Sequence, residues 1–194
     1  VITGDLIDKL AWLPQVCERL TTFAKQIPDG VDFILGNHEY HHDVNKVLDE
    51  LKHNTPMNIL VNSNIQIMGG KQPVYIAGVA YDNDREKEKR EAMIDKALSG
   101  IPDYAFVILL AHHPEFFEEA IERKIPLTLS GHTHGGQIVF MGMPLVPTGT
   151  PYTKGRYVEE QSVCYVNNGT GHWFPIRINC PREITVITFF DGVA

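Results

Sequence analysis

Two patterns of apolar residues alternate along the chain: short consecutive apolar runs, and longer stretches in which apolar residues recur every three or four positions. A consecutive run predicts a buried strand, and the three-to-four-residue spacing predicts a helix with one face against a core. The runs that predict strands, or the end of one, are residues 1–4, 31–35, 59–61, 65–68, 74–79, 106–111, 127–129, 137–140, 162–167 and 184–190. The stretches that predict helices are residues 13–27, 43–52, 84–98 and 114–123.

The order of these elements predicts a mixed α/β fold. Strands and helices alternate in the first half, which favours parallel strands. The second half is richer in hairpin-like strands, and turn residues at 68–73 indicate one hairpin loop. Asp43 is placed to cap the second helix. No linker interrupts the pattern, so we expect one domain over residues 1–194, with two packed sheets and helices outside them.

Composition and charge narrow the class of protein. Of the 194 residues, 43% are hydrophobic and 21% are charged, which is the balance of an ordinary globular domain. The net charge of −7 argues against a general nucleic-acid binder, although bound metal ions would still permit a phosphate substrate. The three cysteines form no CxxC pair and are expected to be free thiols in a reducing compartment.

The N-terminal residues lead to an expectation about the natural protein. The chain begins with Val1 inside a predicted strand rather than with a methionine. We therefore expect a preceding segment in the full-length protein, which would complete the first strand and carry any targeting or membrane-anchoring sequence. Within these 194 residues, no apolar stretch is long enough to span a bilayer.

Four clusters of polar residues share one kind of position, at or directly after the end of a predicted strand. They are TGDLID at 3–8, GNHE at 36–39, AHHP at 111–114 and SGHTH at 130–134. In open α/β sheets, ligands bind just outside the carboxyl ends of the strands. We therefore expect the four clusters to converge on one site.

The clusters contain the side chains of a divalent metal site. One carboxylate, one amide oxygen and three imidazoles come from Asp5, Asn37, His112, His132 and His134. Oxygen and nitrogen ligands without thiolate suit Mn, Fe, Zn or Ni. An aspartate can bridge two ions, and a neutral asparagine limits the charge around them. Two histidines separated by one residue can face two adjacent ions on a turn, whereas on an extended strand they point to opposite faces.

The other histidines have simpler interpretations. His113 directly follows a candidate ligand and is ambiguous by residue type alone. His41 and His42 follow GNHEY and are expected to be solvated residues near a helix start. His53 and His172 stand outside the clusters, where a hydrogen-bonded histidine is commoner than a metal ligand.

In this order, the motifs resemble those of the calcineurin-like metallophosphoesterases. That family carries D-x-H, then G-D-x-x-D, G-N-H-D/E, a single histidine and G-H-x-H. The matching residues here are Gly4-Asp5-Leu6-Ile7-Asp8, Gly36-Asn37-His38-Glu39, His112 and Gly131-His132-Thr133-His134. LLAHHPE, SGHTHGGQ and the stretch from Tyr165 to Ile187 are similar to a bacterial branch that includes membrane-associated phosphodiesterases and lipid A precursor pyrophosphatases.

The resemblance implies a four-layer α/β/β/α sandwich with two mixed sheets, here without its first strand. It implies that Asp5 bridges two metal ions and that His134 binds the first of them. The second ion would be bound by Asn37, His112 and His132. The pattern of the bacterial branch selects the first of the two adjacent histidines, because the ligand there stands two residues before the proline.

The resemblance also implies roles for residues that do not hold metal. His38 would donate a proton to the leaving oxygen or stabilise the transition state. Asp8 and Glu39 would orient the ligands from behind. Asn37 would also touch a phosphate oxygen of the substrate, and Arg156 is a candidate phosphate or head-group contact.

For the rest of the substrate site the sequence offers only candidate regions. The loops at 147–157 and 81–90 are candidates to line the cleft. Four aromatic residues are candidates for contact with an apolar tail, with core or surface packing as the equal alternative: Phe116, Phe117, Trp173 and Phe174.

The chain lacks the family's D-x-H motif, which supplies two ligands of the first ion. We therefore expect the second ion to bind well and the first to bind poorly or not at all, so that this chain holds two ions only if the intact family site is present. The function implied is a metal-dependent phosphohydrolase that cleaves phosphodiester, phosphomonoester or pyrophosphate bonds with metal-activated hydroxide. The alternative is a weakly active or non-catalytic metal-binding scaffold. The expected partner is a phosphate-ester small molecule or lipid head group rather than nucleic acid, at a bacterial cytoplasmic or membrane-associated location.

Overall fold

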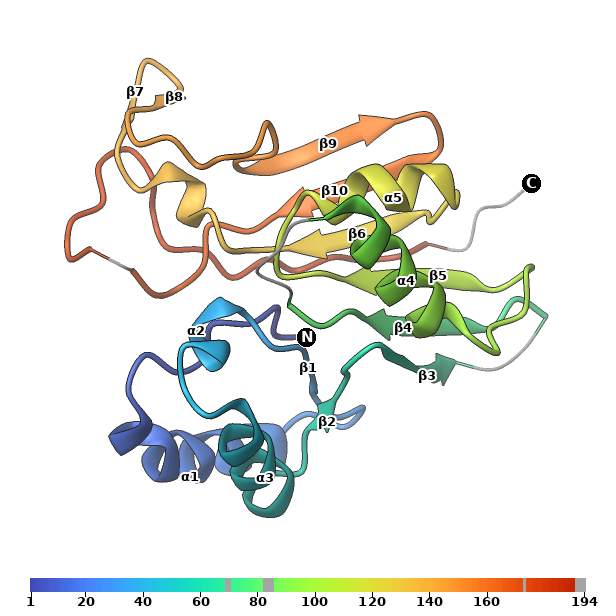
Figure 1. Ribbon diagram of the computed structural model, residues 1–194, viewed down its shortest axis with the longest axis horizontal. Coiled ribbons are helices and arrows are strands. Elements are labelled where there is room, and N and C mark those ends of the chain that lie inside the picture. Colours follow the sequence, from blue (N-terminus) through green and yellow to red (C-terminus); the bar gives the residue numbers. More distant parts are fainter. Residues whose placement is uncertain (69–70, 82–85, 173, 191–194) are drawn as a thin grey trace.

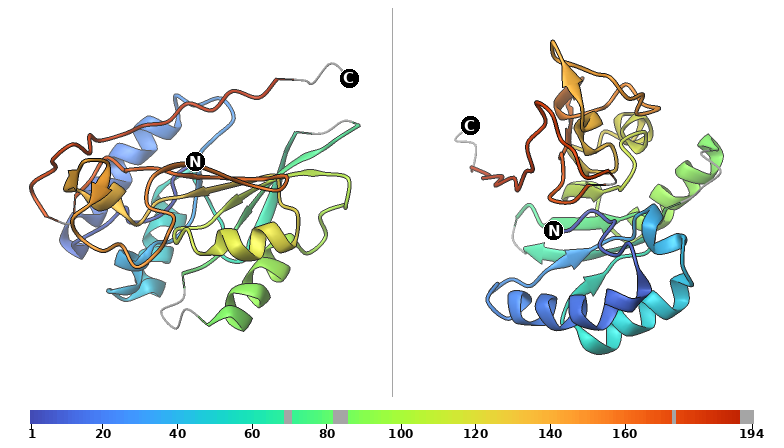
Figure 2. Two further views of the ribbon diagram at one scale, coloured as in Figure 1. Left: turned by 90° about the horizontal axis from the view of Figure 1, so that it is seen from above. Right: turned by 90° about the vertical axis from the view of Figure 1, so that its left-hand side faces the viewer.

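The computed structural model describes residues 1–68, 71–81, 86–172 and 174–190. Its main elements form four layers, in which a small sheet and a large sheet lie between two pairs of helices (Figure 1). The right-hand view of Figure 2 shows the first pair of helices, in blue and cyan, below the sheets. Three clusters of buried apolar residues fill the spaces between the layers. The α/β/β/α architecture implied by the resemblance is confirmed. Of the two sheets only the large one is mixed, because the described residues of the small sheet pair in parallel.

The elements in the first half of the chain are η1 (Leu10–Trp12), α1 (Leu13–Ala24), β1 (Asp32–Phe33), α2 (Asn37–Tyr40), α3 (Val44–Asn54), β2 (Asn58–Ile59), β3 (Ser63–Met68), β4 (Val74–Gly78) and α4 (Lys87–Leu98). Those in the second half are β5 (Phe106–Leu110), α5 (Phe116–Glu122), β6 (Leu127–Ser130), η2 (His134–Gly136), β7 (Val139–Phe140), β8 (Met143–Pro144), β9 (Gly155–Glu159) and β10 (Ser162–Val166).

The small sheet pairs β1 and β2 in parallel, and Ile2 adds a parallel bridge to Phe33. Helices α1 and α3 pack against it through an apolar cluster in which Phe33, Val47 and Leu51 are fully buried. Asp43 caps α3 as predicted, because its side chain accepts hydrogen bonds from the backbone N–H groups of the helix's first turn. This half of the molecule holds the first two polar clusters at the end of its short strands.

The large sheet has the strand order β3-β4-β5-β6-β10-β9. Its four central strands are parallel, and β3 and β9 are antiparallel strands at the two edges. Helices α4 and α5 cover its outer face, where Arg90 donates hydrogen bonds of 2.7–3.0 Å to the fully buried carboxylate of Glu119. Because β5 and β6 run in parallel, the polar clusters that follow them lie at the same edge of the sheet.

Several predicted elements differ from those observed. Residues 184–190 form no strand, because their backbone pairs with no neighbouring strand among the described residues. The sequence pattern did not predict β8 or β9, whose strand state depends on partners elsewhere in the chain. Phe116 and Phe117 are buried in the core beneath α5, so they pack there rather than line a cleft for an apolar tail.

No helix among the described residues combines the length and the apolar character needed to cross a membrane.

Candidate metal centre

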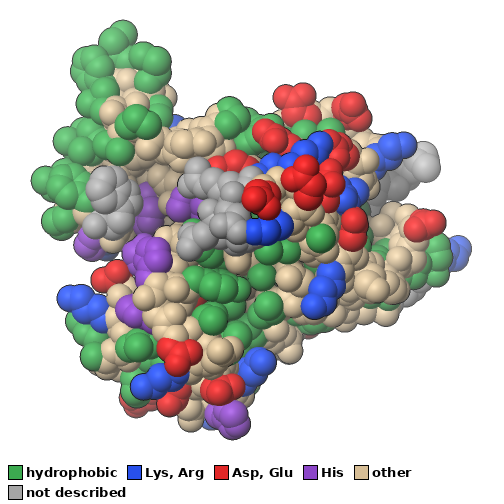
Figure 3. Space-filling view, in the orientation of Figure 1, with side chains coloured by type: hydrophobic (Ala, Val, Ile, Leu, Met, Phe, Trp, Pro, Cys, Tyr) green, Lys and Arg blue, Asp and Glu red, His purple; other side chains and the backbone are tan. Residues whose placement is uncertain are grey.

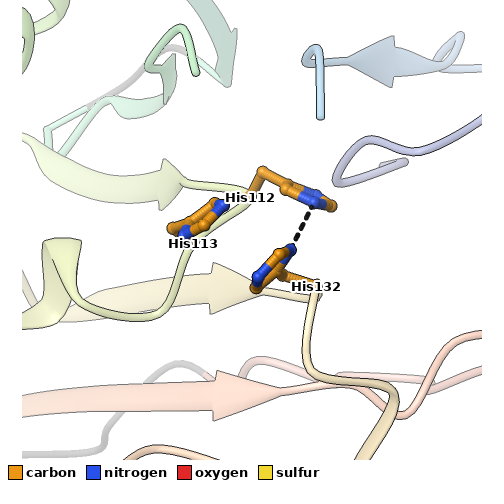
Figure 4. Close-up of side chains that lie close together, drawn as sticks. All are labelled: His112, His113 and His132. Carbon is orange, nitrogen blue, oxygen red and sulfur yellow. Dashed lines mark hydrogen bonds between the residues drawn. The ribbon is translucent and has the colours of Figure 1, made fainter. Parts of the chain in front are cut away.

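The strand-end clusters meet in one place between the two sheets. His112 and His132 follow β5 and β6 of the large sheet, as Figure 4 shows. Asp5 follows the Ile2 bridge and Asn37 begins α2, so both come from the small sheet. The structure thus brings together four of the five residues predicted to bind metal.

The four side chains direct their ligand atoms at one another. Nε2 of His112 lies 3.0 Å from Oδ1 of Asn37 and 3.2 Å from Oδ2 of Asp5. Nδ1 of His132 lies 2.9 Å from the same asparagine oxygen and 3.3 Å from Nε2 of His112. One amide oxygen, one carboxylate oxygen and a second imidazole nitrogen therefore lie against Nε2 of His112.

This convergence fits a cation. Nδ1 of His112 lies 2.6 Å from the carbonyl oxygen of Thr3, to which it donates a hydrogen bond. A neutral His112 must then present a lone pair at Nε2, toward the two oxygens and the second imidazole. Such a group of electron-rich atoms is stable only with a proton or a metal ion between them. The ligand types suit a borderline divalent ion such as Mn, Fe, Zn or Ni.

The pKa shifts around this point agree with that reading. Burial opposes a charge on His112, but the hydrogen bond and the negative charge of Asp5 prevail and raise the pKa of His112. Burial likewise opposes ionisation of Asp5, but His112 and the N–H of His38 hold the pKa of Asp5 well below its ordinary value. Both shifts favour the pairing of a protonated His112 with an ionised Asp5 when no cation is bound.

We expect metal binding to release this proton. Because the pKa of His112 is raised above 6.5, the proton competes with metal at any pH below that raised value. The apparent affinity for Mn²⁺ should fall about tenfold for each pH unit below the pKa of His112 and level off above it. Titration calorimetry in buffers of different protonation enthalpy would measure the released proton directly. An affinity that does not change between acidic and alkaline pH would contradict this linkage.

The loop that carries Asp5 is held by a buried carboxylate. Glu39 is fully buried and accepts hydrogen bonds from the N–H groups of Gly36, Asp5, Leu6 and Ile7, at 2.6, 3.0, 2.7 and 3.1 Å. Burial raises the pKa of Glu39, and several of these N–H groups offset part of the shift. These contacts fit the role predicted for Glu39, which is to orient the metal-binding residues rather than to bind metal itself.

Close backbone packing also positions Asp5. The φ angle of Asp5 is +57°, in the left-handed region that few residues other than glycine adopt. A side chain at Gly36 would collide with Asp5 and with the ring of His112, so only glycine fits at that position. The strained backbone and the glycine contact together bring the carboxylate to the cluster.

The pair His132 and His134 lies on a turn rather than on a strand. Both residues have left-handed φ angles, +67° and +50°, and Thr133 between them is helical. The two rings therefore have different neighbours. His132 joins the cluster, whereas Nδ1 of His134 accepts a hydrogen bond from Arg177 at 3.2 Å.

The electrostatics of the pair favour neutral rings. Burial, then the nearby His113 and His112, lower the pKa of His132 to about 3. Burial and the charge of Arg177 lower the pKa of His134 to about 4. Neutral imidazole is the form that binds metal.

Arg177 is a residue that the sequence pattern did not single out. Its guanidinium also donates to the carbonyl oxygens of Asn168 and Gly171, at 2.8 and 2.6 Å. It therefore ties the ring of His134 to the loop at 168–171. Because the contact spans 43 residues of sequence, no local pattern could have indicated it.

His113 shares the site but not the geometry of a further ligand. A ligand atom of His113 lies within 4.8 Å of those of His112 and His132. However, the ring of His113 stacks on that of His132 with centroids 3.8 Å apart and planes inclined by 24° (Figure 4). A metal ion lies in the plane of each imidazole that binds it, so nearly parallel rings do not direct their lone pairs at one ion. This supports His112, rather than the adjacent His113, as the residue that binds metal.

His38 lies beside the cluster and is paired with Asp8. Nδ1 of His38 lies 3.1 Å from Oδ1 of Asp8, and its ring is partly exposed. A pocket of about 250 Å³ is lined by His38, Asp5 and Asn37 together with His132 and His134. The Asp8 contact orients the imidazole, and the imidazole faces the pocket.

Of the remaining predicted substrate contacts, only some lie at this pocket. Arg156 is exposed on β9 and is not among the residues that line this pocket. Val146, Pro147 and Thr148 do line it, so part of the predicted loop at 147–157 reaches the site. Trp173 and residues 82–85 of the other predicted loop lie outside the described residues.

The fold and the cluster together define a class: an α/β/β/α protein whose strand ends carry oxygen and nitrogen ligands for divalent metal. The family model described as calcineurin-like phosphoesterase matches residues 1–136, and the chain belongs to that family. This membership confirms the resemblance to the family, and it implies divalent metal ions and phosphate-ester chemistry. The similarity to one bacterial branch stays a prediction.

Relatives named as metallophosphoesterases cover nearly all of the chain. An uncharacterized metallophosphoesterase of Campylobacter jejuni is 36% identical over 96% of this chain and 49% of its own length. One from Helicobacter pylori strain J99 is 32% identical, over 96% of this chain and 50% of its own. A transmembrane protein with metallophosphoesterase domain from Danio rerio is 32% identical over 96% of this chain and 44% of its own. The chain thus spans about half the length of these relatives.

Proposed function

We propose that this chain is a metal-dependent phosphohydrolase that cleaves phosphodiester, phosphomonoester or pyrophosphate bonds. The observation that carries the proposal is the contact of Asp5, Asn37 and His132 with Nε2 of His112, at 3.2, 3.0 and 3.3 Å, together with the 2.9 Å contact between His132 and Asn37. We assign these four residues to one divalent cation. When bound, such a cation polarises a phosphate oxygen and lowers the pKa of water.

The protein's own residues would perform the remaining steps. His38 lines the pocket beside the cluster, and Asp8 holds its Nδ1 at 3.1 Å. We assign His38 the donation of a proton to the leaving oxygen, which is a typical contribution of a positioned imidazole. Asp8 would keep the ring oriented, and Asn37 would also contact a phosphate oxygen. Arg156 as a substrate contact stays a prediction that its exposed position does not strengthen.

A weakly active or scaffold function is the second candidate, and one contact favours it. The guanidinium of Arg177 can only donate, so its hydrogen bond to His134 uses the lone pair at Nδ1. A neutral His134 in this arrangement carries its proton on Nε2 and has no second lone pair for an ion. This supports strong binding of one cation and weak binding of another at Asp5 and His134.

The substrate class is proposed only broadly. The family supports phosphate esters, and two relatives named as transmembrane proteins with a metallophosphoesterase domain support a lipid head group. We propose action on a small-molecule or lipid phosphate ester, at a membrane or in the bacterial cytoplasm, rather than on nucleic acid.

A direct assay separates the two candidate functions. The chain is supplied with Mn²⁺ and incubated with bis(p-nitrophenyl) phosphate and, separately, with p-nitrophenyl phosphate. Hydrolysis that disappears with EDTA and returns with Mn²⁺ supports the phosphohydrolase, and the preferred substrate identifies diester or monoester cleavage.

The matched control is the His132→Ala variant, which removes one ligand from the cluster. It should lose bound metal and activity together. Full metal content in the parent chain without hydrolysis of either substrate would overturn the catalytic proposal in favour of the scaffold.

A further inference from the structure

The hairpin formed by β7 and β8 exposes an unusual concentration of large apolar side chains. Phe140, Met141, Met143 and Leu145 are 61%, 83%, 67% and 63% exposed. The hairpin projects from one end of the molecule in Figure 1 and in the right-hand view of Figure 2. In Figure 3 it forms a green projection above the purple histidine side chains. Single exposed apolar residues are ordinary, but a contiguous group of this kind marks an interaction surface.

The uncharged surface extends beyond the hairpin. Residues 137–153 contain no Asp, Glu, Lys or Arg. Ile138 bridges in parallel to Ile178, which is 48% exposed, and Ile176 beside it is exposed to the same fraction. The first cationic side chain of this neighbouring segment that is itself well exposed is Arg182. Arg182 lines one surface pocket with Asn179, whose side chain donates to Val139 of the hairpin, so a cationic side chain lies near the hairpin's base.

The base of the hairpin is firmly attached, which makes the tip a fixed feature. The N–H of Val139 donates to the carbonyl oxygen of Ile178 at 2.9 Å, and the N–H of Ile178 donates to that of Gln137 at 2.8 Å. The side chain of Asn179 donates to the carbonyl oxygen of Val139 at 2.9 Å. Val139 itself is buried. The backbone at the base is thus hydrogen-bonded, and the large side chains at the tip are the most exposed part of this surface.

We propose that this hairpin tip, made of Phe140, Met141, Met143 and Leu145, inserts into the interfacial layer of a lipid bilayer. A bilayer accepts apolar side chains without requiring the specific hydrogen bonds that a protein partner would need. Arg182 at the base suits the phosphate groups of anionic lipids. A second copy of the chain fits less well, because a stable interface buries about 800 Å² per partner over some 20–30 residues. The tip offers four large side chains on a convex surface.

Insertion would bring the candidate active site close to the membrane surface. The chain leaves the hairpin through Val146, Pro147 and Thr148, which line the same pocket as His38 and His132. The pocket would then open where the phosphate groups of lipids lie. This inference goes beyond the proposed hydrolysis and does not depend on it, because membrane binding is measured without substrate.

The test is sedimentation with vesicles of phosphatidylcholine and phosphatidylglycerol in a three-to-one ratio. The parent chain should sediment with the vesicles. The variant with Phe140→Ser, Met141→Ser, Met143→Ser and Leu145→Ser should bind at least about tenfold more weakly, because each lost apolar side chain reduces the partition. The matched control is Trp12→Ser with Tyr104→Ser, which removes two side chains of 62% and 65% exposure elsewhere and should bind as the parent does.

A single substitution tests the same surface without risk to the fold of the hairpin. The tryptophan introduced by Met141→Trp should emit at a shorter wavelength when vesicles are added, and brominated lipid should quench this emission. Unchanged emission of the Met141→Trp variant at saturating lipid would overturn the proposal. Equal vesicle binding by the parent and by the variant with four serine substitutions would overturn it too. A third outcome would assign the surface to a second copy of the chain and overturn the membrane proposal. In that case the parent forms a concentration-dependent dimer and does not bind vesicles, and the variant with four serine substitutions forms no dimer.

Discussion

Replacing His38 by asparagine should lower kcat for a phosphate ester by about 10²–10⁴-fold while the metal content stays unchanged. His38 lines the pocket beside the four converging ligands, and Asp8 holds its Nδ1 at 3.1 Å. Asparagine keeps a polar side chain there but has no group that can donate a proton and recover it near neutral pH. Steady-state kinetics with bis(p-nitrophenyl) phosphate and metal analysis of the same preparation would measure both quantities.

Two further variants locate the origin of that effect. Asp8→Asn keeps a hydrogen-bonding side chain opposite His38 but removes its charge, so it should reduce kcat less than the loss of the imidazole. His53→Asn changes an exposed histidine on α3 and should leave turnover unchanged. Near-normal turnover of the His38→Asn variant with full metal would refute the proton-donor role, and loss of metal would make His38 a ligand instead.

Replacing Glu39 by alanine should lower the free energy of unfolding by about 4 kcal/mol. The carboxylate accepts four backbone N–H groups, from Gly36, Asp5, Leu6 and Ile7, and is fully buried. Its removal leaves those donors without their partner and opens a cavity. Because domains are stable by only about 5–15 kcal/mol, this is a large fraction of the total. Urea denaturation followed by circular dichroism would measure it.

The same variant should weaken metal binding, because the loop that carries Asp5 loses its anchor. Glu39→Gln keeps the volume and one acceptor oxygen, so it should lie between the parent and the alanine variant in both stability and metal affinity. Glu18→Ala removes an exposed carboxylate from α1 and should change stability by no more than about 0.5 kcal/mol. An alanine variant at position 39 as stable as this control would contradict the anchoring role.

Local patterns predicted much of the fold because local physics decides those features. The apolar spacing predicted the helix observed as α1, although it ends at Ala24 rather than at residue 27. The cap at Asp43 depends on N–H groups two and three residues away, so sequence alone could indicate it. The consecutive apolar run of β5 was recognisable because that strand is covered on both faces.

Strand pairing was less predictable, for a physical reason. A strand exists only with its partner, and the partner can lie anywhere in the chain. The edge strand β9 was missed although its pairing with β10 is regular. Residues 184–190 have the composition of a strand, yet their backbone pairs with no strand of the described chain.

The sequence by itself determined which residues could bind metal and that they follow strands, because ligand chemistry and strand periodicity are both local properties. Only the tertiary structure decided how they are used. It brings Asp5, Asn37 and His132 against His112, and it stacks His113 on His132. It also ties His134 to Arg177 and leaves the β7–β8 hairpin uncovered. These outcomes depend on contacts between segments far apart in the sequence, and no local pattern encodes such contacts.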